Sequence, residues 1–211
     1  MPASDNVLVG HTIRHPPVEM GKQKIIAGRL DPPLNADGTK MINLLKASTL
    51  VPSFDILVTS PLKRAFDTAR QLTDIKDEDV TVSRLCAERS YGKLEGVPPD
   101  ALGAIKPKTF YVAVGGIDYS LNPPDGETLE ELRGRAASFH DFIKTLQGQR
   151  VLVVSHEAFL QQYHGLLRGL DVYHALAFPV RYLEINRFSF KGNRQVFHEQ
   201  VHQPEQPYEH W

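Results

Sequence analysis

The strongest constraint on the fold is the alternation of short apolar segments with helical patterns along the chain. Val151–Ser155 reads VLVVS, a continuous apolar run of strand length, and a helical pattern over Glu157–Leu170 follows it. Asn6–Ile13 and Asp55–Thr59 are two further apolar segments of strand length. A strand that is apolar on both sides is typical of a parallel sheet covered on both faces. The alternation therefore predicts an α/β chain, a three-layer αβα sandwich with a mostly parallel central sheet.

Other patterns fit the same arrangement. After the Asp55–Thr59 strand, Ser60-Pro61 has the form of a helix N-cap and a first-turn proline. The remaining predicted elements are helices at Thr39–Leu50 and Thr128–Gln147, a strand at Val80–Leu85, and a closing hairpin of Tyr182–Phe190 with Gln195–His202.

The length of 211 residues predicts a single domain spanning residues 1–211. Residues 97–125 are rich in Pro and Gly and lack a sustained period, so we expect a lid or specificity insertion there. The segment after His202 reads QPEQPYEHW, and we expect this tail to be poorly ordered.

Charge and cysteine content argue against several classes of function. The chain has 24 Lys and Arg against 25 Asp and Glu, whereas proteins that bind nucleic acids or membrane surfaces carry a basic excess. No apolar run approaches the ~18 residues of a membrane span. The lone Cys86 suits a reducing compartment. We therefore expect a cytoplasmic protein with neither a nucleic-acid nor a membrane partner.

Two of the expected strands run directly into a histidine. The first leads into Arg14-His15, and Val151–Ser155 leads into His156. The carboxyl ends of parallel strands meet at one edge of a sheet, where ligands bind. Arg64, in the first turn of the helix after another strand, would join them. Two arginines and two histidines at one edge favour binding of a phosphate dianion and attack on phosphorus by a neutral imidazole.

An acid is also needed to protonate the leaving oxygen of a phosphate ester. Glu88, just past the third predicted strand, is the candidate. His11 is a rival to His15 as nucleophile, but it lies ~13 Å back along the strand. We therefore assign the attack to His15 and interpret His11 as a buried or supporting residue.

At these residues the sequence resembles the histidine phosphatase superfamily, in its phosphoglycerate mutase-like and α-ribazole phosphatase-like branch. One matching segment would be weak support, but six occur in the family's order over roughly residues 7–170. They are Arg14-His15, Gly28–Leu34 (GRLDPPL), Ser60–Ala69 (SPLKRAFDTA), Glu88–Gly96 (ERSYGKLEG), Gly126-Glu127-Thr128 and Val154-Ser155-His156.

The resemblance implies a phosphoglycerate mutase-like fold and a phosphohistidine mechanism. His15 would accept the phosphoryl group, while Arg14, Arg64 and His156 would bind it and stabilise its charge. Glu88 would protonate the leaving oxygen and later activate water. The implied activity is hydrolysis of a small phosphorylated metabolite, a phosphate monoester. It needs neither metal nor cofactor, because the arginines and histidines supply the positive charge.

Substrate contacts are also expected at Gly28 and Tyr91. Three other residues depart from the family pattern. Pro16 replaces the usual glycine after the nucleophile, and Gly21 stands where many members carry a phosphate-binding Asn. Glu157 replaces the glycine after the second histidine. A carboxylate is favoured at that helix N-terminus, but it would repel a phosphate if it turned inward.

Two alternatives stay open. One is a phosphoglycerate mutase that uses 2,3-bisphosphoglycerate, since Glu88–Gly92 is similar to its motif. Mutases follow that motif with a lysine and an arginine pair, whereas here Lys106 and Lys108 are the cations of the insertion. The other is a catalytically weakened protein that binds a phosphorylated ligand as a regulator, which the three departures motivate. No pattern identifies the substrate or the oligomeric state.

Overall fold

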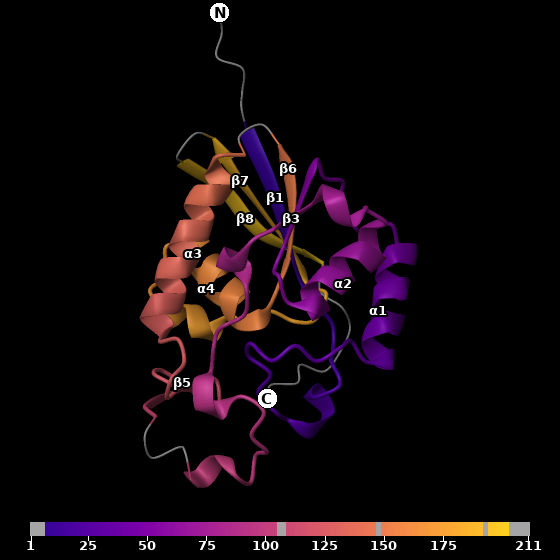
Figure 1. Ribbon diagram of the computed structural model, residues 1–211. Coiled ribbons are helices and arrows are strands. Elements are labelled where there is room, and N and C mark those ends of the chain that lie inside the picture. Colours follow the sequence, from indigo (N-terminus) through magenta and orange to yellow (C-terminus); the bar gives the residue numbers. More distant parts are fainter. Residues whose placement is uncertain (1–6, 105–108, 147–148, 192–193, 203–211) are drawn as a thin grey trace, which may run out of the picture.

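A mostly parallel sheet forms the centre of the computed structural model, which describes residues 7–104, 109–146, 149–191 and 194–202 (Figure 1). Its strand order is β3-β2-β6-β1-β7-β8. The first four of these strands run parallel, and β7 and β8 are antiparallel to their neighbours. These strands are β1 (Val7–Arg14), β2 (Ile56–Thr59), β3 (Val80–Val82), β6 (Arg150–Ser155), β7 (Ile185–Lys191) and β8 (Arg194–His202).

Helices cover both faces of this sheet (Figure 1). They are α1 (Ala36–Ala47), α2 (Lys63–Thr73), α3 (Leu129–Lys144) and α4 (Glu157–Leu167). Val151 and Val153 of β6 belong to the core that includes residues of α3 and α4. Leu152 and Val154 belong to the core that includes residues of α1 and α2. Because alternate side chains of β6 enter opposite cores, the whole strand is apolar, and the predicted α/β fold class is confirmed.

Several element boundaries differ from the prediction. Helix α1 begins earlier than predicted, because Asn35 caps it by accepting a hydrogen bond from the N–H of Gly38. The prediction that Ser60 is a helix N-cap was wrong: α2 begins at Lys63, and the Oγ of Ser60 accepts from the N–H of Leu62. Strand β3 is shorter than predicted because a 3-10 turn follows it, and α3 and α4 end earlier than predicted.

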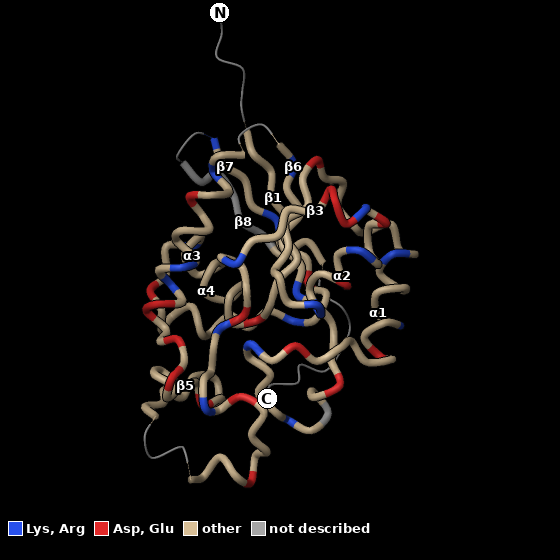
Figure 2. The backbone as a smooth tube through the Cα atoms, viewed as in Figure 1, with Lys and Arg blue, Asp and Glu red and all other residues tan. Residues whose placement is uncertain are grey.

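The segment 97–125 contains a hairpin of β4 (Tyr111–Val114) and β5 (Ile117–Ser120), beyond the carboxyl ends of the sheet strands (Figure 1). Both signs of charge are spread over the outer helices and loops (Figure 2). Residues 105–108, with Lys106 and Lys108, and the tail after residue 202 lie outside the described residues. The lid role and the single-domain organisation stay predictions.

Candidate active site

The two strand-end histidines lie side by side at one edge of the sheet. Strands β1 and β6 pair in parallel with Arg14 opposite Ser155, so the chain leaves both strands at the same level. The backbone N–H of His15 donates to the carbonyl of Ser155 at 3.0 Å. The rings of His15 and His156 meet edge to face, with centroids 5.0 Å apart. Parallel pairing therefore brings both imidazoles into one cluster.

Arg64 joins this cluster from the first turn of α2 and is almost completely buried. Its Nε donates to Nε2 of His15 at 3.2 Å. Its Nη1 and Nη2 donate to the carbonyls of Leu30 and Gly28, both at 2.7 Å. Gly28 has φ +49°, and a Cβ there would lie 2.2 Å from Oε1 of Glu95, so this position requires glycine. Gly28 thus lines the cavity and supports Arg64 through its carbonyl.

His15 is held as a neutral imidazole with a defined tautomer. Burial, and then the charges of Arg64 and Arg14, hold the pKa of His15 well below its ordinary value. Nδ1 lies 2.7 Å from the carbonyl oxygen of Pro16, which can only accept, so Nδ1 carries the proton. Nε2 is then unprotonated and accepts from Arg64. This nitrogen has the lone pair that a nucleophile requires, and Pro16 contributes an acceptor rather than an N–H.

His156 is fully buried and hydrogen-bonded to Ser60, with 2.7 Å between Nε2 and Oγ. The same Oγ accepts from the N–H of Leu62 at 3.2 Å, and its own proton can be donated to Nε2. Burial is the main cause that holds the pKa of His156 well below its ordinary value. With Ser60 as the donor, the neutral ring carries its proton on Nδ1, which bonds to no atom of the described residues. Sequence reasoning missed this use of Ser60.

Arg14 is buried and fixed on several sides. Its Nη1 donates to the carbonyl of Val180 at 2.7 Å, and its Nη2 forms an ion pair with Oε2 of Glu157 at 2.9 Å. The guanidinium stacks over the ring of Tyr182, 4.0 Å from the centroid. Glu157 therefore turns inward and contacts the arginine that was expected to bind phosphate. Tyr182 belongs to no recognised motif, and no signal in the sequence points to it.

Glu88 lies in the same cavity with its carboxyl group almost fully buried. Its Oε1 accepts from the N–H of Arg89 at 2.8 Å. The N–H groups of Ala158 and Phe159, in the first turn of α4, donate to it at 3.4 and 3.3 Å. Burial raises the pKa of Glu88 against the opposing charge of Arg64. A carboxyl group with a raised pKa suits proton donation near neutral pH.

Arg135 of α3 holds the segment that carries Glu88. It pairs with both carboxylate oxygens of Glu127, at 2.7 and 2.6 Å. Its Nη1 also donates to the carbonyls of Leu85 and Ala87, at 2.9 and 2.7 Å. The planar fork of a guanidinium is suited to such a set of acceptors. This role of Arg135 was not predicted from the sequence.

Arg89 is buried at the cavity wall and anchors the insertion. Its Nη1 and Nη2 donate to the carbonyls of Ser120 and Leu121, at 2.7 and 2.9 Å. Its Nε donates to the carbonyl of Glu127 at 2.8 Å. The residue next to Glu88 therefore ties the end of the β4–β5 hairpin to the segment that carries the acid.

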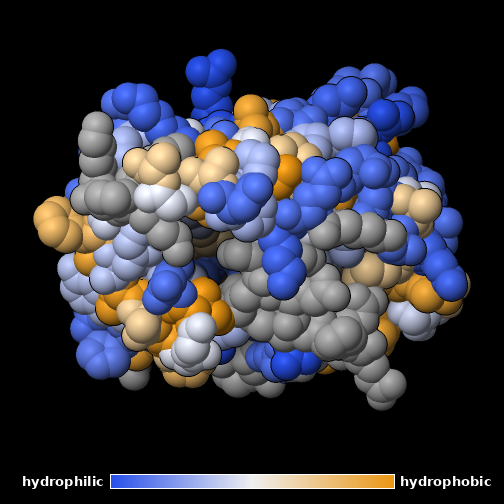
Figure 3. Space-filling model, turned by 90° about the horizontal axis from the view of Figure 1, so that it is seen from below, coloured by the Kyte–Doolittle hydropathy of each residue, from blue (hydrophilic) through white to orange (hydrophobic). Residues whose placement is uncertain are grey.

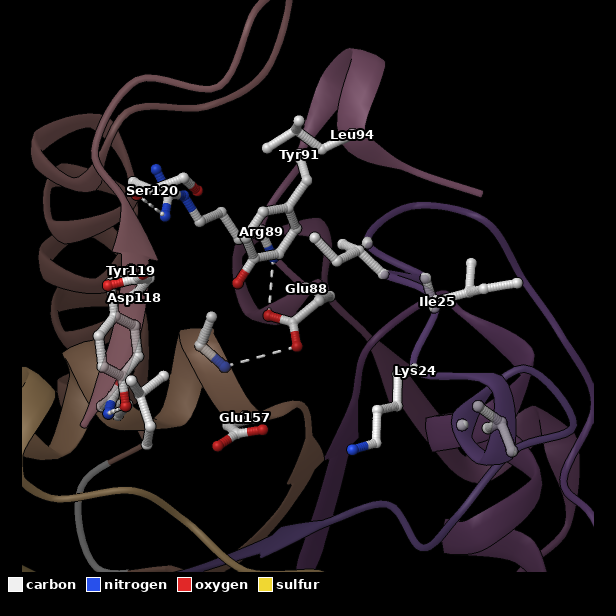
Figure 4. A pocket seen from close by; sticks show the side chains of 18 of the residues that line it. Lys24, Ile25, Glu88, Arg89, Tyr91, Leu94, Asp118, Tyr119, Ser120 and Glu157 are labelled. Atoms are coloured by element: carbon white, nitrogen blue, oxygen red, sulfur yellow. Dashed lines mark hydrogen bonds between the residues drawn. The ribbon is translucent and has the colours of Figure 1, made fainter. Parts of the chain in front are cut away.

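The cluster opens into a cavity of about 450 Å³ (Figure 4). Seen from below the view of Figure 1, the surface is hollowed and hydrophobic residues lie along one side of the hollow (Figure 3). Tyr91 lines the cavity, as do Gly21 and several residues of the insertion, whereas the buried His156 is not part of its wall. The charged or ionisable side chains of the wall come from Arg14, His15, Lys24, Arg64, Glu88, Arg89, Tyr91, Tyr111, Asp118, Tyr119, Glu157 and Tyr182.

His11 stays away from this cavity. It lies on β1 opposite Arg187, where burial and the Arg187 charge lower its pKa to about 4. No group of three or more His, Cys, Asp or Glu side chains within the described residues is arranged to hold a metal ion. Across the same residues, no helix has the length and hydropathy needed to cross a membrane.

Comparison with known sequences identifies the relatives of the chain. A family model described as the histidine phosphatase superfamily (branch 1) matches residues 11–202. The uncharacterized phosphatase PhoE of Bacillus subtilis is 31% identical over 160 residues, 75% of each chain. The 2,3-bisphosphoglycerate-dependent phosphoglycerate mutase of a Bradyrhizobium species is 33% identical over 163 residues, 72% of this chain and 76% of the relative. The relatives thus include both phosphatases and mutases.

Comparison with solved structures supports the same fold. The chain resembles a phosphoserine phosphatase mutant from Entamoeba histolytica in complex with phosphoserine, with a TM-score of 0.73 and 24% identity over 90% of this chain and 94% of that one. At this identity the likeness concerns the fold. Since the family model covers nearly the whole chain and the fold agrees, this protein belongs to the histidine phosphatase superfamily.

Proposed function

We propose that the protein is a metal-independent phosphomonoesterase that hydrolyses a small phosphorylated metabolite through a phosphohistidine intermediate. The observation that carries this proposal is the state of His15: its Nδ1 proton is held by the Pro16 carbonyl, and its unprotonated Nε2 faces Arg64. Glu88, an acid with a raised pKa, lines the same cavity. Nucleophile, cations and acid are thereby combined in one site.

In the first half of the reaction, Nε2 of His15 attacks phosphorus and the bond from phosphorus to the alcohol oxygen breaks. The Glu88 carboxyl group gives its proton to that leaving oxygen. Arg14 and Arg64 bind the phosphoryl oxygens. The Nε–H of Arg64 exchanges its hydrogen bond to His15 for one to a phosphoryl oxygen. The Nδ1–H of His156 donates to another phosphoryl oxygen. The products are phosphohistidine and a neutral alcohol.

In the second half, the Glu88 carboxylate takes a proton from water, and the water oxygen attacks phosphorus. The bond from phosphorus to Nε2 breaks, which releases inorganic phosphate and restores neutral His15 and protonated Glu88. The two arginines supply the positive charge in both halves, so the proposed reaction uses no metal and no cofactor.

The proposal is tested by hydrolysis of p-nitrophenyl phosphate, with His15→Ala as the control. We expect turnover that survives chelators, an acid-labile and base-stable phosphoenzyme after alkaline quench, and loss of both in His15→Ala. Turnover that persists in His15→Ala, or that vanishes with chelators, would contradict the mechanism. Absence of both turnover and phosphoenzyme would favour the weakened regulator, which the departures at Pro16, Gly21 and Glu157 motivate.

The mutase is the second candidate, favoured by the identity to the Bradyrhizobium relative. Isomerisation of 3-phosphoglycerate that depends on 2,3-bisphosphoglycerate, with little p-nitrophenyl phosphate hydrolysis, would place it first. We also propose a cytoplasmic location, on the single Cys86 and the near-neutral charge. Cell fractionation tests that location.

A further inference from the structure

Glu157 places a carboxylate in the cavity beside Glu88. It opens α4, whose next two residues, Ala158 and Phe159, donate their N–H groups to Glu88. Its side chain is 18% exposed, lines the cavity and pairs with Arg14 at 2.9 Å. Figure 4 shows the Glu157 carboxylate below Glu88, facing the open middle of the pocket. An alcohol that takes its proton from Glu88 therefore leaves next to Glu157.

The charge of Glu157 acts on this part of the cavity. The pKa values of Glu88, Tyr91 and Tyr119 are each raised, by burial first and by the Glu157 charge among the further causes. A phosphate dianion on Arg14 and Arg64 would make Arg14 serve two anions at once. Glu157 would then share the charge of Arg14 with the dianion, on the side where the alcohol lies.

The rest of the described wall offers a second anion one lysine, Lys24, at its exposed part. The hydrogen-bonding nitrogens of Arg89 donate to backbone carbonyls of the insertion and of Glu127. Lys24 and Asp118 are both exposed, so solvent screens their charges more than that of Glu157. Apolar side chains that include Ile25, Leu94 and Ile117 complete the wall and suit methylene groups.

We propose that Glu157 is a specificity-determining residue that selects phosphate esters whose alcohol bears an ammonium group close to the ester oxygen. The selection rests on the proposed phosphatase activity. An ammonium group donates a charge-assisted hydrogen bond to the carboxylate and restores the charge balance. A carboxylate or second phosphate at the same position is repelled, which discriminates against phosphorylated acids and bisphosphates.

A pair of esters of similar size tests the selection: 2-aminoethyl phosphate and carboxymethyl phosphate, with ethyl phosphate as the neutral reference. We expect wild-type kcat/KM to favour the aminoethyl ester over the carboxymethyl ester by about tenfold or more, the size of one charge-assisted hydrogen bond. Glu157→Gln keeps the shape of the side chain and removes its charge. It is expected to lower this ratio by about tenfold.

Asp118→Asn is the matched control, because it removes a carboxylate from the exposed part of the same wall. Its charge is screened by solvent, so we expect the ratio to change by less than about twofold. An equal change in Asp118→Asn and Glu157→Gln would contradict the assignment to Glu157, since overall charge would then explain the preference. A wild-type preference for the carboxymethyl ester, or a ratio unmoved by Glu157→Gln, would overturn the proposal while leaving the phosphatase activity intact.

A binding measurement distinguishes failure of the Glu157 selection from failure of the proposed phosphatase activity. Calorimetric titration of both charged esters into His15→Ala, with and without Glu157→Gln, needs no turnover. If no ester is hydrolysed by the wild type, the proposed function fails, and the affinity ratio still decides the selection. If both charged esters bind with the same affinity, and Glu157→Gln changes neither, the selection is overturned. If the aminoethyl ester binds more tightly and loses this advantage in Glu157→Gln, the selection is supported.

Discussion

Nε2 of His156 lies 2.7 Å from Oγ of Ser60, a residue 96 positions earlier in the chain. Ser60 follows β2 and His156 follows β6, and these strands are parallel neighbours in the sheet. The N–H of Leu62 donates to the same Oγ, and we assign the hydroxyl proton of Ser60 to the imidazole. This assignment keeps the proton of His156 on Nδ1, the nitrogen proposed to donate to a phosphoryl oxygen.

Ser60→Ala removes this control over the tautomer of His156. We expect kcat to fall by about 10- to 100-fold, since one donor to the phosphoryl group is then present in a fraction of molecules. Ser60→Thr keeps the hydroxyl group and should retain most of the activity. Nitrogen-15 NMR of His156 should show Nδ1 protonated in the wild type and in Ser60→Thr, and mixed tautomers in Ser60→Ala. A wild-type tautomer and rate in Ser60→Ala would refute the positioning role.

Glu88→Gln removes the proton donor while keeping the shape of the side chain. Since burial raises the pKa of Glu88, the wild-type group stays protonated to a higher pH than an ordinary carboxyl group. Activity on alkyl phosphates should fall as pH rises through that pKa, and Glu88→Gln should abolish this alkaline limb and lower kcat/KM by about 100- to 10,000-fold.

The leaving group provides the control for Glu88→Gln. The oxygen of p-nitrophenol leaves as a stable anion and needs no proton, so we expect a much smaller loss of kcat/KM with p-nitrophenyl phosphate than with ethyl phosphate. This quantity reports the transfer to His15 and not the later attack of water, which Glu88 assists for both esters. Equal losses of kcat/KM on both esters, measured by steady-state kinetics across the pH range, would argue for a different role of Glu88.

The positions of His15 and His156 could be predicted from the sequence, because the edge to which parallel strands deliver their carboxyl ends depends only on strand direction. The partners of these histidines could not. Ser60 has the form of a helix cap, and the contacts of Tyr182 and Arg135 depend on side-chain directions across distant segments. Local spacing contains no information about such contacts.

The hairpin within residues 97–125 has a local signal in the sequence. Gly115-Gly116 separates Tyr111–Val114 from Ile117–Ser120, and two glycines between short β-rich runs predict a two-residue turn. Both glycines have positive φ, +60° and +83°, as such a turn requires. The Pro and Gly residues elsewhere in the segment hide this signal, and together they predict only a lid or specificity insertion.

The buried His156 should make the fold sensitive to acid. Its pKa in the folded state is held well below the ordinary value, whereas in the unfolded chain it titrates near pH ~6.5. As pH falls below about 6.5, only the unfolded state binds the proton, so stability is lost on acidification and is constant at higher pH. In His156→Asn this contribution is absent. The difference in the free energy of unfolding between the two proteins should change by up to about 1.4 kcal/mol per pH unit below pH ~6.5. If urea unfolding gave a difference in the free energy of unfolding between the wild type and His156→Asn that does not change as the pH falls, the prediction would be wrong.

Arg135 should contribute strongly to both stability and activity. Arg135→Ala leaves the half-buried Glu127 carboxylate and the carbonyls of Leu85 and Ala87 without their donor, at a cost of about 3–5 kcal/mol in the free energy of unfolding. Because those carbonyls lie in the segment that positions Glu88, kcat for alkyl phosphates should fall as well.

Arg150 provides the matched control for Arg135. It forms a two-pronged pair with Asp55, but on the exposed surface, so Arg150→Ala should cost far less stability and leave kcat unchanged. Arg135→Lys keeps the charge but loses the fork, and we expect it to fall between the wild type and Arg135→Ala. Urea unfolding and ethyl phosphate kinetics on the three variants check this order. Equal losses in Arg135→Ala and Arg150→Ala would show that the Arg135 contacts do not hold the acid in place.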